Sequence, residues 1–318
     1  MSKKAQDVVN EDIMQPTTAL HKVRYTRGRR SLNSDVVLVE LPLQIRLLWT
    51  DNNEQLSRIF SITMRTPGDD KHLIIGLLLA EGVISNVKQI KDIYPDPANE
   101  DQAAVAHKSI PANNDAQENS AQANLWEVRL ANTVTPNLPT LERYQITYSS
   151  CGLCGATSLK SLELKNPPRL NDKEHWLNPE NVHNMPNLMR EKQDLFTQTG
   201  AAHAAGLFDE TGQLVDLKED VGRHNALDKL IGALALSQPE QARCLCIVVS
   251  GRISFELVQK TIMAGIAVMI AVGAPSDLAI KAAKRFGLTL IGYTNAESFN
   301  VYHGEWRLQT LEEVCQKT

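Results

Sequence analysis

Residues 244–293, CLCIVVSGRISFELVQKTIMAGIAVMIAVGAPSDLAIKAAKRFGLTLIGY, are the stretch that decides the fold. Three short apolar runs of the buried-strand type (CLCIVVSG, AVMIAVGA and LTLIGY) alternate with two helical segments, SFELVQKTIMAG and SDLAIKAAKRFG, the second ending at Gly287. Such alternation with short links predicts parallel strands joined by right-handed helical crossovers. We therefore expect an α/β layer structure in the C-terminal half of the chain.

The residues before this stretch predict a hairpin and then a largely β-rich region. AAHAAGLF and GQLVDLKE are expected to form a hairpin that leads into a helix at about 225–236. Further upstream, two β-like runs flank the polar turn Asp51-Asn52-Asn53, and LWEVRLAN at 125–132 predicts another strand. Between them HLIIGLLLAEG predicts a buried helix, with Asp69 or Asp70 as its cap and Gly82 as its end.

These patterns divide the chain into four expected regions. Residues 1–20 are expected to be a disordered tail and 21–150 a smaller β-rich N-terminal domain. Within it, residues 95–124 lack aromatic side chains, which predicts a disordered insertion because little burial offsets the ordering entropy. Residues 151–195 are expected to be a cysteine-containing loop and linker, and 196–318 the α/β domain. The basic stretch from His21 to Arg30 is expected to be a solvated arm or an anion contact.

Composition excludes several classes of protein. The 318 residues carry 33 Lys and Arg against 37 Asp and Glu, a net charge of −4, so a general nucleic-acid binder is not expected. No apolar run is long enough to span a membrane, and no secretory signal is evident. Five cysteines, an odd number, argue against a disulfide scaffold and for the cytoplasm.

The sharpest motif is Ser149-Ser150-Cys151-Gly152-Leu153-Cys154-Gly155. Two thiols at this spacing can form a redox pair, bind zinc or carry sulfur, and the flanking glycines leave them uncrowded. A structural zinc site needs two more ligands. Cys244 and Cys246 are expected to be poor candidates, because we expect their side chains to lie on opposite faces of a buried strand. The motif alone leaves the three uses open.

Polar residues gather at three other places. Glu219–Asn225 (EDVGRHN) stands directly before a helix, where Arg223 and His224 are candidate contacts for an anion, or plain neighbours of a helix cap. His203 lies in the small-residue segment TGAAHAA, which would let a ligand approach the backbone. Ser250-Gly251-Arg252 and Ala274–Asp277 follow two predicted parallel strands, the edge at which open α/β sheets bind ligands.

In combination these motifs resemble the FdhD family. The resemblance rests on CGLCG, TGAAHAAGLF, EDVGRHNALDKLIG, SGRISFELVQK and TPGDDKHLIIGLLLAEGVI, and runs from about Val36 to Tyr302 outside the 95–124 segment. It implies a cytidine-deaminase-like C-terminal domain and a sulfur carrier that formate dehydrogenase needs for activity. Such a carrier accepts sulfur from a cysteine desulfurase and passes it to the molybdenum cofactor in its bis-guanine-dinucleotide form. It also implies a homodimer.

The resemblance assigns roles to individual residues. Cys151 is expected to carry the persulfide and Cys154 to be the second thiol. The cofactor is expected to bind the loop Tyr293-Thr294-Asn295-Ala296-Glu297-Ser298. Apart from the resemblance, the placement of Arg223 and His224 before a helix makes them candidates to stabilise the persulfide anion or the cofactor phosphates, and His203 is a further candidate cofactor contact. Family members often have basic residues in this loop, where this chain has Glu297 and no Lys or Arg. The alternative is a cofactor-binding chaperone whose cysteines are structural or bind zinc.

Overall fold

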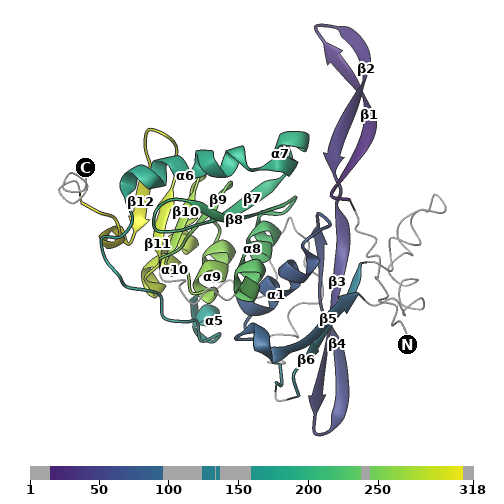
Figure 1. Ribbon diagram of the computed structural model, residues 1–318, viewed down its shortest axis with the longest axis vertical. Coiled ribbons are helices and arrows are strands. Elements are labelled where there is room, and N and C mark those ends of the chain that lie inside the picture. The colour runs from purple at the N-terminus through teal and green to yellow at the C-terminus, as the bar shows by residue number, and fades with distance from the viewer. Residues whose placement is uncertain (1–14, 96–123, 133, 137–158, 238–243, 311–318) are drawn as a thin grey trace, which may run out of the picture.

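The structure, a computed structural model, describes residues 15–95, 124–132, 134–136, 159–237 and 244–310. Its described strands form three sheets of two, four and six strands (Figure 1). None of the helices in these segments is long and apolar enough to cross a bilayer. The expectations for the tail up to residue 14, for most of the 95–124 insertion and for the CGLCG motif fall outside the described residues.

The six-stranded sheet occupies the C-terminal half in the order β12-β11-β10-β9-β7-β8. Its central strands β9, β10 and β11 are parallel, which confirms the alternation in the sequence. β7 pairs antiparallel with both β8 and β9, so the expected hairpin is also confirmed, and β12 is antiparallel to β11. The strands are His203–Phe208 (β7), Leu214–Asp220 (β8), Cys246–Val249 (β9), Val268–Ala271 (β10), Thr289–Gly292 (β11) and Asn300–His303 (β12).

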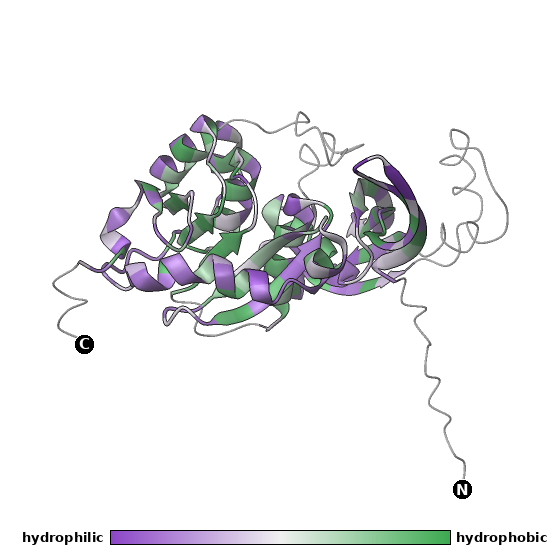
Figure 2. Cartoon of the chain, turned by 90° about the horizontal axis from the view of Figure 1, so that it is seen from above, coloured by the Kyte–Doolittle hydropathy of each residue, from purple (hydrophilic) through white to green (hydrophobic). Residues whose placement is uncertain are grey.

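Helices cover both faces of this sheet. On one face, α8 (Arg223–Ser237), α9 (Phe255–Met263) and α10 (Asp277–Phe286) bury apolar side chains with the strands in one core cluster. On the other face, α6 (Pro179–Glu191) packs through Val182, Met185 and Met189. Figure 2 shows the hydrophobic colour concentrated in the strands and in the helix surfaces that face them. The result is the expected mixed α/β layer structure.

The N-terminal region is built on the four-stranded sheet, in the order β4-β3-β6-β5. β3 (Leu41–Asp51) and β4 (Glu54–Arg65) form the predicted hairpin, while β6 (Leu125–Leu130) runs parallel to β3. β5 (Ile90–Pro95), preceded by the short 3₁₀ helix η1 (Val87–Gln89), closes the sheet at the side of β6. Leu43, Ile45, Leu47 and Trp49 alternate along β3 and supply the face that packs against a helix.

That helix, α1 (Asp70–Ala80), lies between the four-stranded sheet and α8 (Figure 1). The prediction that it is buried is confirmed, and Gly82 ends it with φ 70°. Asp69 occupies the predicted N-cap position, but it takes a left-handed conformation and its carboxylate bonds His72 Nδ1 (2.8 Å) rather than a backbone N–H. The cap position therefore joins α1 to its own first turn through a side chain.

Two glycines let α1 and α8 cross in close contact. A Cβ added to Gly76 of α1 would stand 1.9 Å from the carbonyl oxygen of Asp228, and one added to Gly232 of α8 would stand 1.9 Å from that of His72. The absence of a side chain at both positions allows backbone to approach backbone. This crossing ties the N-terminal region to the helix layer of the six-stranded sheet.

Two expected boundaries differ from the structure. β1 (Thr17–Thr26) pairs with β2 (Arg29–Leu38), so residues 17–20 belong to a hairpin and not to a disordered tail. The basic stretch from His21 to Arg30 is part of that exposed hairpin. Periodicity gave no signal there, because nearly every side chain of β1 is exposed and alternation between two faces is lost.

The expected linker is also partly helical in the structure. Helices α5 (Leu159–Glu163) and α6 lie within it, and α7 (Asp194–Thr199) begins there. α6 starts at Asn178, whose side chain accepts from the N–H of Glu180, and Pro179 occupies its first turn. The sequence did not predict α6, because Pro186 lies inside it and an internal proline argues against a helix. The division of the chain into a β-rich domain and an α/β domain stays a prediction.

Candidate functional site at one edge of the six-stranded sheet

The loops that follow β9, β10 and β11 are joined backbone to backbone at one edge of the sheet. Gly273 donates to the carbonyl of Gly251 (3.2 Å), and Tyr293 donates to the carbonyl of Gly273 (3.2 Å). A Cβ on Gly273 would come 2.9 Å from the backbone of Arg252, so a side chain there would push the loops apart. His203 and Asn300 begin antiparallel strands at this same edge. All nine predicted cofactor-binding residues therefore lie along it.

His203 and Arg223 meet over Gly251. The Ser250 hydroxyl accepts from the N–H of Ala204 (3.0 Å) and lies 3.4 Å from His203 Nδ1. A Cβ on Gly251 would lie 3.5 Å from the His203 ring and 3.8 Å from Cδ of Arg223. Burial, with the nearby Arg223 charge, lowers the pKa of His203 below its usual value. His203 is thus a neutral group beside a fixed cation at neutral pH.

His224 faces the start of α9, whereas His203 lies next to Ser250. Its Nε2 lies 3.1 Å from the hydroxyl of Ser254 and 3.6 Å from the Glu256 carboxylate. Burial lowers the pKa of His224 to about 4, and the Glu256 charge opposes this only in part. Although burial opposes it, the charge of Lys260 lowers the pKa of Glu256. At neutral pH His203 and His224 are therefore uncharged imidazoles, and they lie near the Arg223 guanidinium and the Glu256 carboxylate.

The loop 293–298 is held in shape by its own side chains. Asn295 Oδ1 accepts from the N–H groups of Glu297 (2.8 Å) and Ser298 (3.0 Å). The backbone carbonyl of Asn295 lies 3.0 Å from Nδ1 of His183 on α6. Tyr293 takes a left-handed φ of 54° and its side chain is 52% exposed. Glu297 is exposed as well. The loop presents a tyrosine and a carboxylate to solvent from a fixed backbone.

Two buried donors at this edge have no acceptor among the described residues. They are Nε of Arg223 and the hydroxyl of Thr294, a residue that is only 1% exposed. Buried polar groups normally find a partner, because leaving one unpaired costs about 1–3 kcal/mol. Both groups donate to the kind of oxygen that a phosphate or a carbonyl-bearing base presents. The residues present therefore fit an oxygen-rich, anionic ligand.

A buried ion pair fixes the loop that carries Arg223 and His224. Asp220 ends β8, is fully buried, and its carboxylate lies 2.8 Å from Nζ of Lys229 on α8. The same carboxylate accepts from Gly222 (2.9 Å) and from the side chain of Asn225 (3.1 Å). Asp220 therefore anchors the turn between β8 and α8.

The structure describes two of the five cysteines. Cys244 and Cys246 are both buried in one core cluster, so the expectation that they face opposite sides of a strand is wrong: residues two apart share a face. Burial raises the pKa of both thiols. Within the described segments no three His, Cys, Asp or Glu side chains gather as a metal site. Cys151 and Cys154 lie outside the described residues, so their predicted roles stay predictions.

The chain re-enters the structure after Cys154 at the other edge of the sheet. Glu163, at the end of α5, pairs with Arg285 (2.8 Å), and Lys165 pairs with Glu81 (2.5 Å). Arg285 lies in the last turn of α10, which returns from the end of β10 to the start of β11. α5 therefore lies opposite the edge that carries His203.

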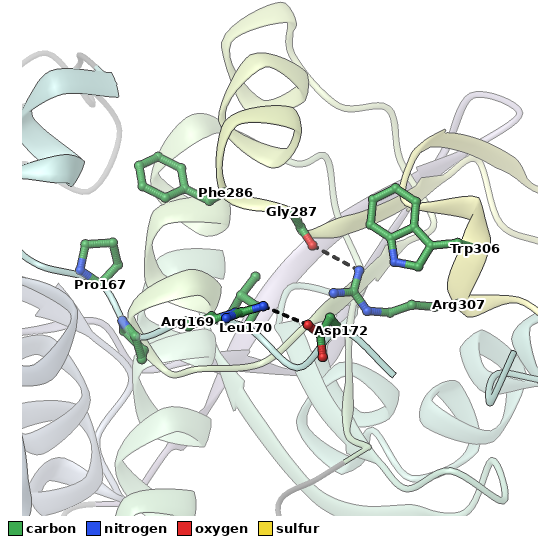
Figure 3. A pocket seen from close by; sticks show the side chains of 9 residues that line it. Pro167, Arg169, Leu170, Asp172, Phe286, Gly287, Trp306 and Arg307 are labelled. Atoms are coloured by element: carbon green, nitrogen blue, oxygen red, sulfur yellow. Dashed lines mark hydrogen bonds and ion pairs between the residues drawn. The ribbon is translucent and has the colours of Figure 1, made fainter. Parts of the chain in front are cut away.

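A cavity of about 420 Å³ also lies at that opposite edge (Figure 3). Phe286, Trp306 and prolines 167 and 168 give it apolar walls. Arg307, which belongs to the short 3₁₀ helix η2 (Glu305–Arg307), donates to the carbonyls of Gly287 (2.9 Å) and Asn171 (2.5 Å), so its guanidinium is engaged by the protein. None of the predicted cofactor-binding residues lines this cavity.

Comparison with known proteins decides the family. The model of the FdhD/NarQ family matches residues 39–309. The chain belongs to the FdhD/NarQ family. Two relatives, each called "Sulfur carrier protein FdhD", come from Streptomyces avermitilis (41% identical) and Streptomyces coelicolor (39% identical); each match covers 92% of this chain and 96% of the relative.

A solved structure supports the fold of this family member. The crystal structure of a putative formate dehydrogenase accessory protein from Desulfotalea psychrophila superposes with a TM-score of 0.64 at 23% identity, covering 92% of this chain and all of that one. At this identity the likeness shows a shared fold. The cytidine-deaminase-like character expected of the C-terminal region stays a prediction.

Sequence reasoning missed three features of the site. Glu256 is an ordinary first-turn acid in the sequence, and only the structure brings it to His224. Lys229 follows a helical pattern, and its pairing with Asp220 joins two elements that periodicity treats separately. His183 lies on α6, inside the expected linker. A signal was available at Ser250-Gly251, which the sequence already placed at a strand end.

Proposed function

We propose that this FdhD/NarQ family member is a sulfur carrier for formate dehydrogenase that uses a cysteine persulfide. It takes sulfane sulfur from a cysteine desulfurase on Cys151 and passes it to the molybdenum cofactor, in its bis-guanine-dinucleotide form, before the cofactor enters formate dehydrogenase. The observation that carries the proposal is the 41% identity to a sulfur carrier over nearly the whole chain, combined with the CGLCG motif. We also propose that the protein acts in the cytoplasm and as a homodimer.

Loading is a thiol exchange that needs no outside oxidant. The Cys151 thiolate attacks the outer sulfur of the desulfurase persulfide, so a sulfur–sulfur bond forms on Cys151 and the one on the desulfurase breaks. The desulfurase cysteine leaves as a thiolate. The sulfur keeps its oxidation state throughout, and one protein thiol replaces another as its carrier.

Release uses the second thiol. Cys154 attacks the cysteine sulfur of the Cys151 persulfide, which forms a Cys151–Cys154 disulfide and expels the outer sulfur as hydrosulfide. The outer sulfur gains two electrons, and the two cysteines lose them. A cellular thiol reductant then restores both thiols. The spacing of two residues between the cysteines suits this step, because the second thiol stays near the first.

The two cysteines that the structure describes, Cys244 and Cys246, support the choice of Cys151 and Cys154. Cys246 is fully buried in β9 and Cys244 is nearly so. Because burial raises their thiol pKa, neither is a ready nucleophile at neutral pH. Sulfur loading by exchange requires a thiolate, and these two positions disfavour it.

The sheet edge that carries His203 is the proposed binding place of the cofactor's nucleotide parts. The cofactor is the cargo that accepts sulfur. Arg223 supplies a fixed cation and an unpaired donor, and Thr294 supplies a second unpaired donor. Neutral His203 and His224 add hydrogen-bonding capacity without repelling or attracting charge. Glu297 is exposed on the loop, where it favours contact with a base or ribose over contact with a phosphate.

The test is a sulfur-loading experiment on Cys151→Ala and Cys154→Ala variants. Each protein is incubated with a cysteine desulfurase and cysteine, and intact and peptide mass spectra are recorded without reductant. We expect the wild type to gain one sulfur atom on the peptide that contains Cys151. Cys154→Ala should load but fail to release hydrosulfide, and Cys151→Ala should lose both loading and formate dehydrogenase activation.

Cys244→Ala is the matched control, because it removes a thiol that burial makes unreactive. It should load as the wild type does. If no variant or wild-type protein gains sulfur from an active desulfurase, the persulfide mechanism is wrong. If Cys151→Ala folds and still activates formate dehydrogenase, the protein is a cofactor-binding chaperone and its cysteines are structural.

A further inference from the structure

Glu256 lies between the proposed cofactor edge and a buried ion pair. It belongs to the first turn of α9, and its two carboxylate oxygens face two different residues. Oε2 lies 3.6 Å from Nε2 of His224, and Oε1 lies 3.7 Å from Nζ of Lys260. The proposed sulfur and cofactor contacts include His224 but give Glu256 no role.

Lys260 holds Glu256 from the interior of the protein. Its side chain is buried, and Nζ donates to both carboxylate oxygens of Asp228 on α8, at 2.9 and 2.8 Å. Because Asp228 fixes Nζ, Glu256 faces an immobile cation one turn along its own helix. Burial opposes the ionisation of Glu256, but the Lys260 charge outweighs it and lowers the pKa of the carboxyl group. Glu256 is therefore a carboxylate at neutral pH.

The neighbours of His224 Nε2 decide which ring nitrogen carries the proton. A neutral imidazole has one N–H donor and one acceptor nitrogen, and its partners select between the two forms. The Ser254 hydroxyl, 3.1 Å from Nε2, donates and accepts equally well and so selects neither form. The Glu256 carboxylate only accepts, and its charge repels a nitrogen lone pair. It therefore favours the form in which Nε2 carries the hydrogen.

We propose that Glu256 is a positioning residue that fixes His224 in its Nε2–H form, so that Nδ1 is an acceptor for the nucleoside of the bound cofactor. No described residue forms a hydrogen bond to Nδ1. Arg223 and Thr294 bring unpaired donors to the same edge, and phosphate oxygens accept from such donors. An acceptor complements them, because a guanine base carries N–H groups and a ribose carries O–H groups. The inference rests on the proposed cofactor edge.

NMR shows directly which nitrogen of His224 is protonated. Full-length protein is labelled with ¹⁵N-histidine, and of its eight histidines the one whose signals are lost in His224→Gln is His224. In long-range ¹H–¹⁵N spectra at neutral pH, a ring nitrogen with hydrogen and one without have well-separated chemical shifts. We expect Nε2–H in the wild type. In Glu256→Gln we expect a mixture of both forms, since an amide donates as well as accepts.

Guanosine diphosphate is the probe for binding, because it has the base, ribose and phosphates of the proposed cofactor's nucleotide part. Loss of a negative charge alone would strengthen binding of this anion to Glu256→Gln. Loss of the fixed acceptor should instead weaken binding about two- to tenfold, measured by calorimetry. Glu180→Gln is the matched control, because exposed Glu180 has the same position after the cap of α6. It should leave both the His224 signals and the affinity unchanged.

The two readouts separate this inference from the proposed function. The inference is wrong if Nδ1 carries the hydrogen in the wild type or if Glu256→Gln keeps the Nε2–H form. It is also wrong if Glu256→Gln binds the probe as tightly as the wild type or more tightly. If the wild type does not bind guanosine diphosphate while His224 responds to Glu256→Gln, the cofactor edge is wrong and the positioning of His224 by Glu256 stands.

Discussion

His224 lies where burial, more than any neighbouring charge, sets its state of protonation. Its pKa is lowered to about 4, whereas an unfolded histidine titrates near 6.5. Between these values the unfolded chain binds the proton that the folded chain refuses, so the free energy of unfolding falls as pH drops from 6.5 to 4. We expect this one residue to contribute a loss of up to about 3 kcal/mol across that window.

Urea unfolding at several pH values between 4.5 and 7 measures this contribution. His224→Gln keeps a polar partner for Ser254 but cannot titrate, so its free energy of unfolding should depend less steeply on pH than that of the wild type. His21→Gln, in the exposed hairpin β1–β2, is the control substitution and should leave the wild-type slope unchanged. Equal slopes in the wild type and His224→Gln would show that the folded protein accepts the proton.

At the scale of elements, the crossing of α1 and α8 makes two glycines structural. Helix propensity alone favours alanine over glycine by about 1 kcal/mol in a helix interior. Here the new Cβ of Gly76→Ala would meet the Asp228 carbonyl, and that of Gly232→Ala the His72 carbonyl. Both substitutions must move the helices apart. We expect each to lower the free energy of unfolding by about 2–3 kcal/mol, measured by urea denaturation.

Ala235→Gly on the same helix separates packing from propensity. This substitution adds no atoms, so it creates no clash. It should lower the free energy of unfolding by about 1 kcal/mol, because glycine is a poorer helix former than alanine. The double variant Gly76→Ala, Gly232→Ala should cost less than the sum of its parts, since one separation of the helices relieves both clashes. A neutral or stabilising Gly76→Ala would mean that the crossing is loose.

At the scale of the whole molecule, sequence predicts what local pattern encodes. The parallel strands β9, β10 and β11 were predicted because their apolar runs are short and bounded by helices. The same reasoning placed Ser250 and Ala274 at one edge, where the structure has them. It did not find the third sheet, β1–β2, or the pairing of β6 beside β3, because both depend on contacts between strands and leave no period in either strand alone.

The candidate site shows the same division. His203 and Arg223 were identified from residue type and position, yet their meeting over Gly251 requires two strands and a helix to be in register. Asp220 and Lys229 are unremarkable as single residues, and only burial makes their ion pair decisive for the turn. Spacing in the sequence can propose candidates, and tertiary packing chooses which of them touch.

The hairpin β1–β2 extends from the body of the molecule and contributes to none of its core clusters (Figure 1). Several of its apolar side chains are open to water, with Tyr25 71% and Leu32 68% exposed, and a two-stranded ribbon adds little stability on its own. Deleting residues 1–38 should therefore change Tm by less than about 4 °C and keep unfolding cooperative, as calorimetry would show. Gly76→Ala in the same chain is the contrast, because it disturbs the core and should lower Tm more. A large loss of Tm on deletion would mean that the hairpin is bound by the body or by a second chain, and its basic residues would then be the first place to look for that contact.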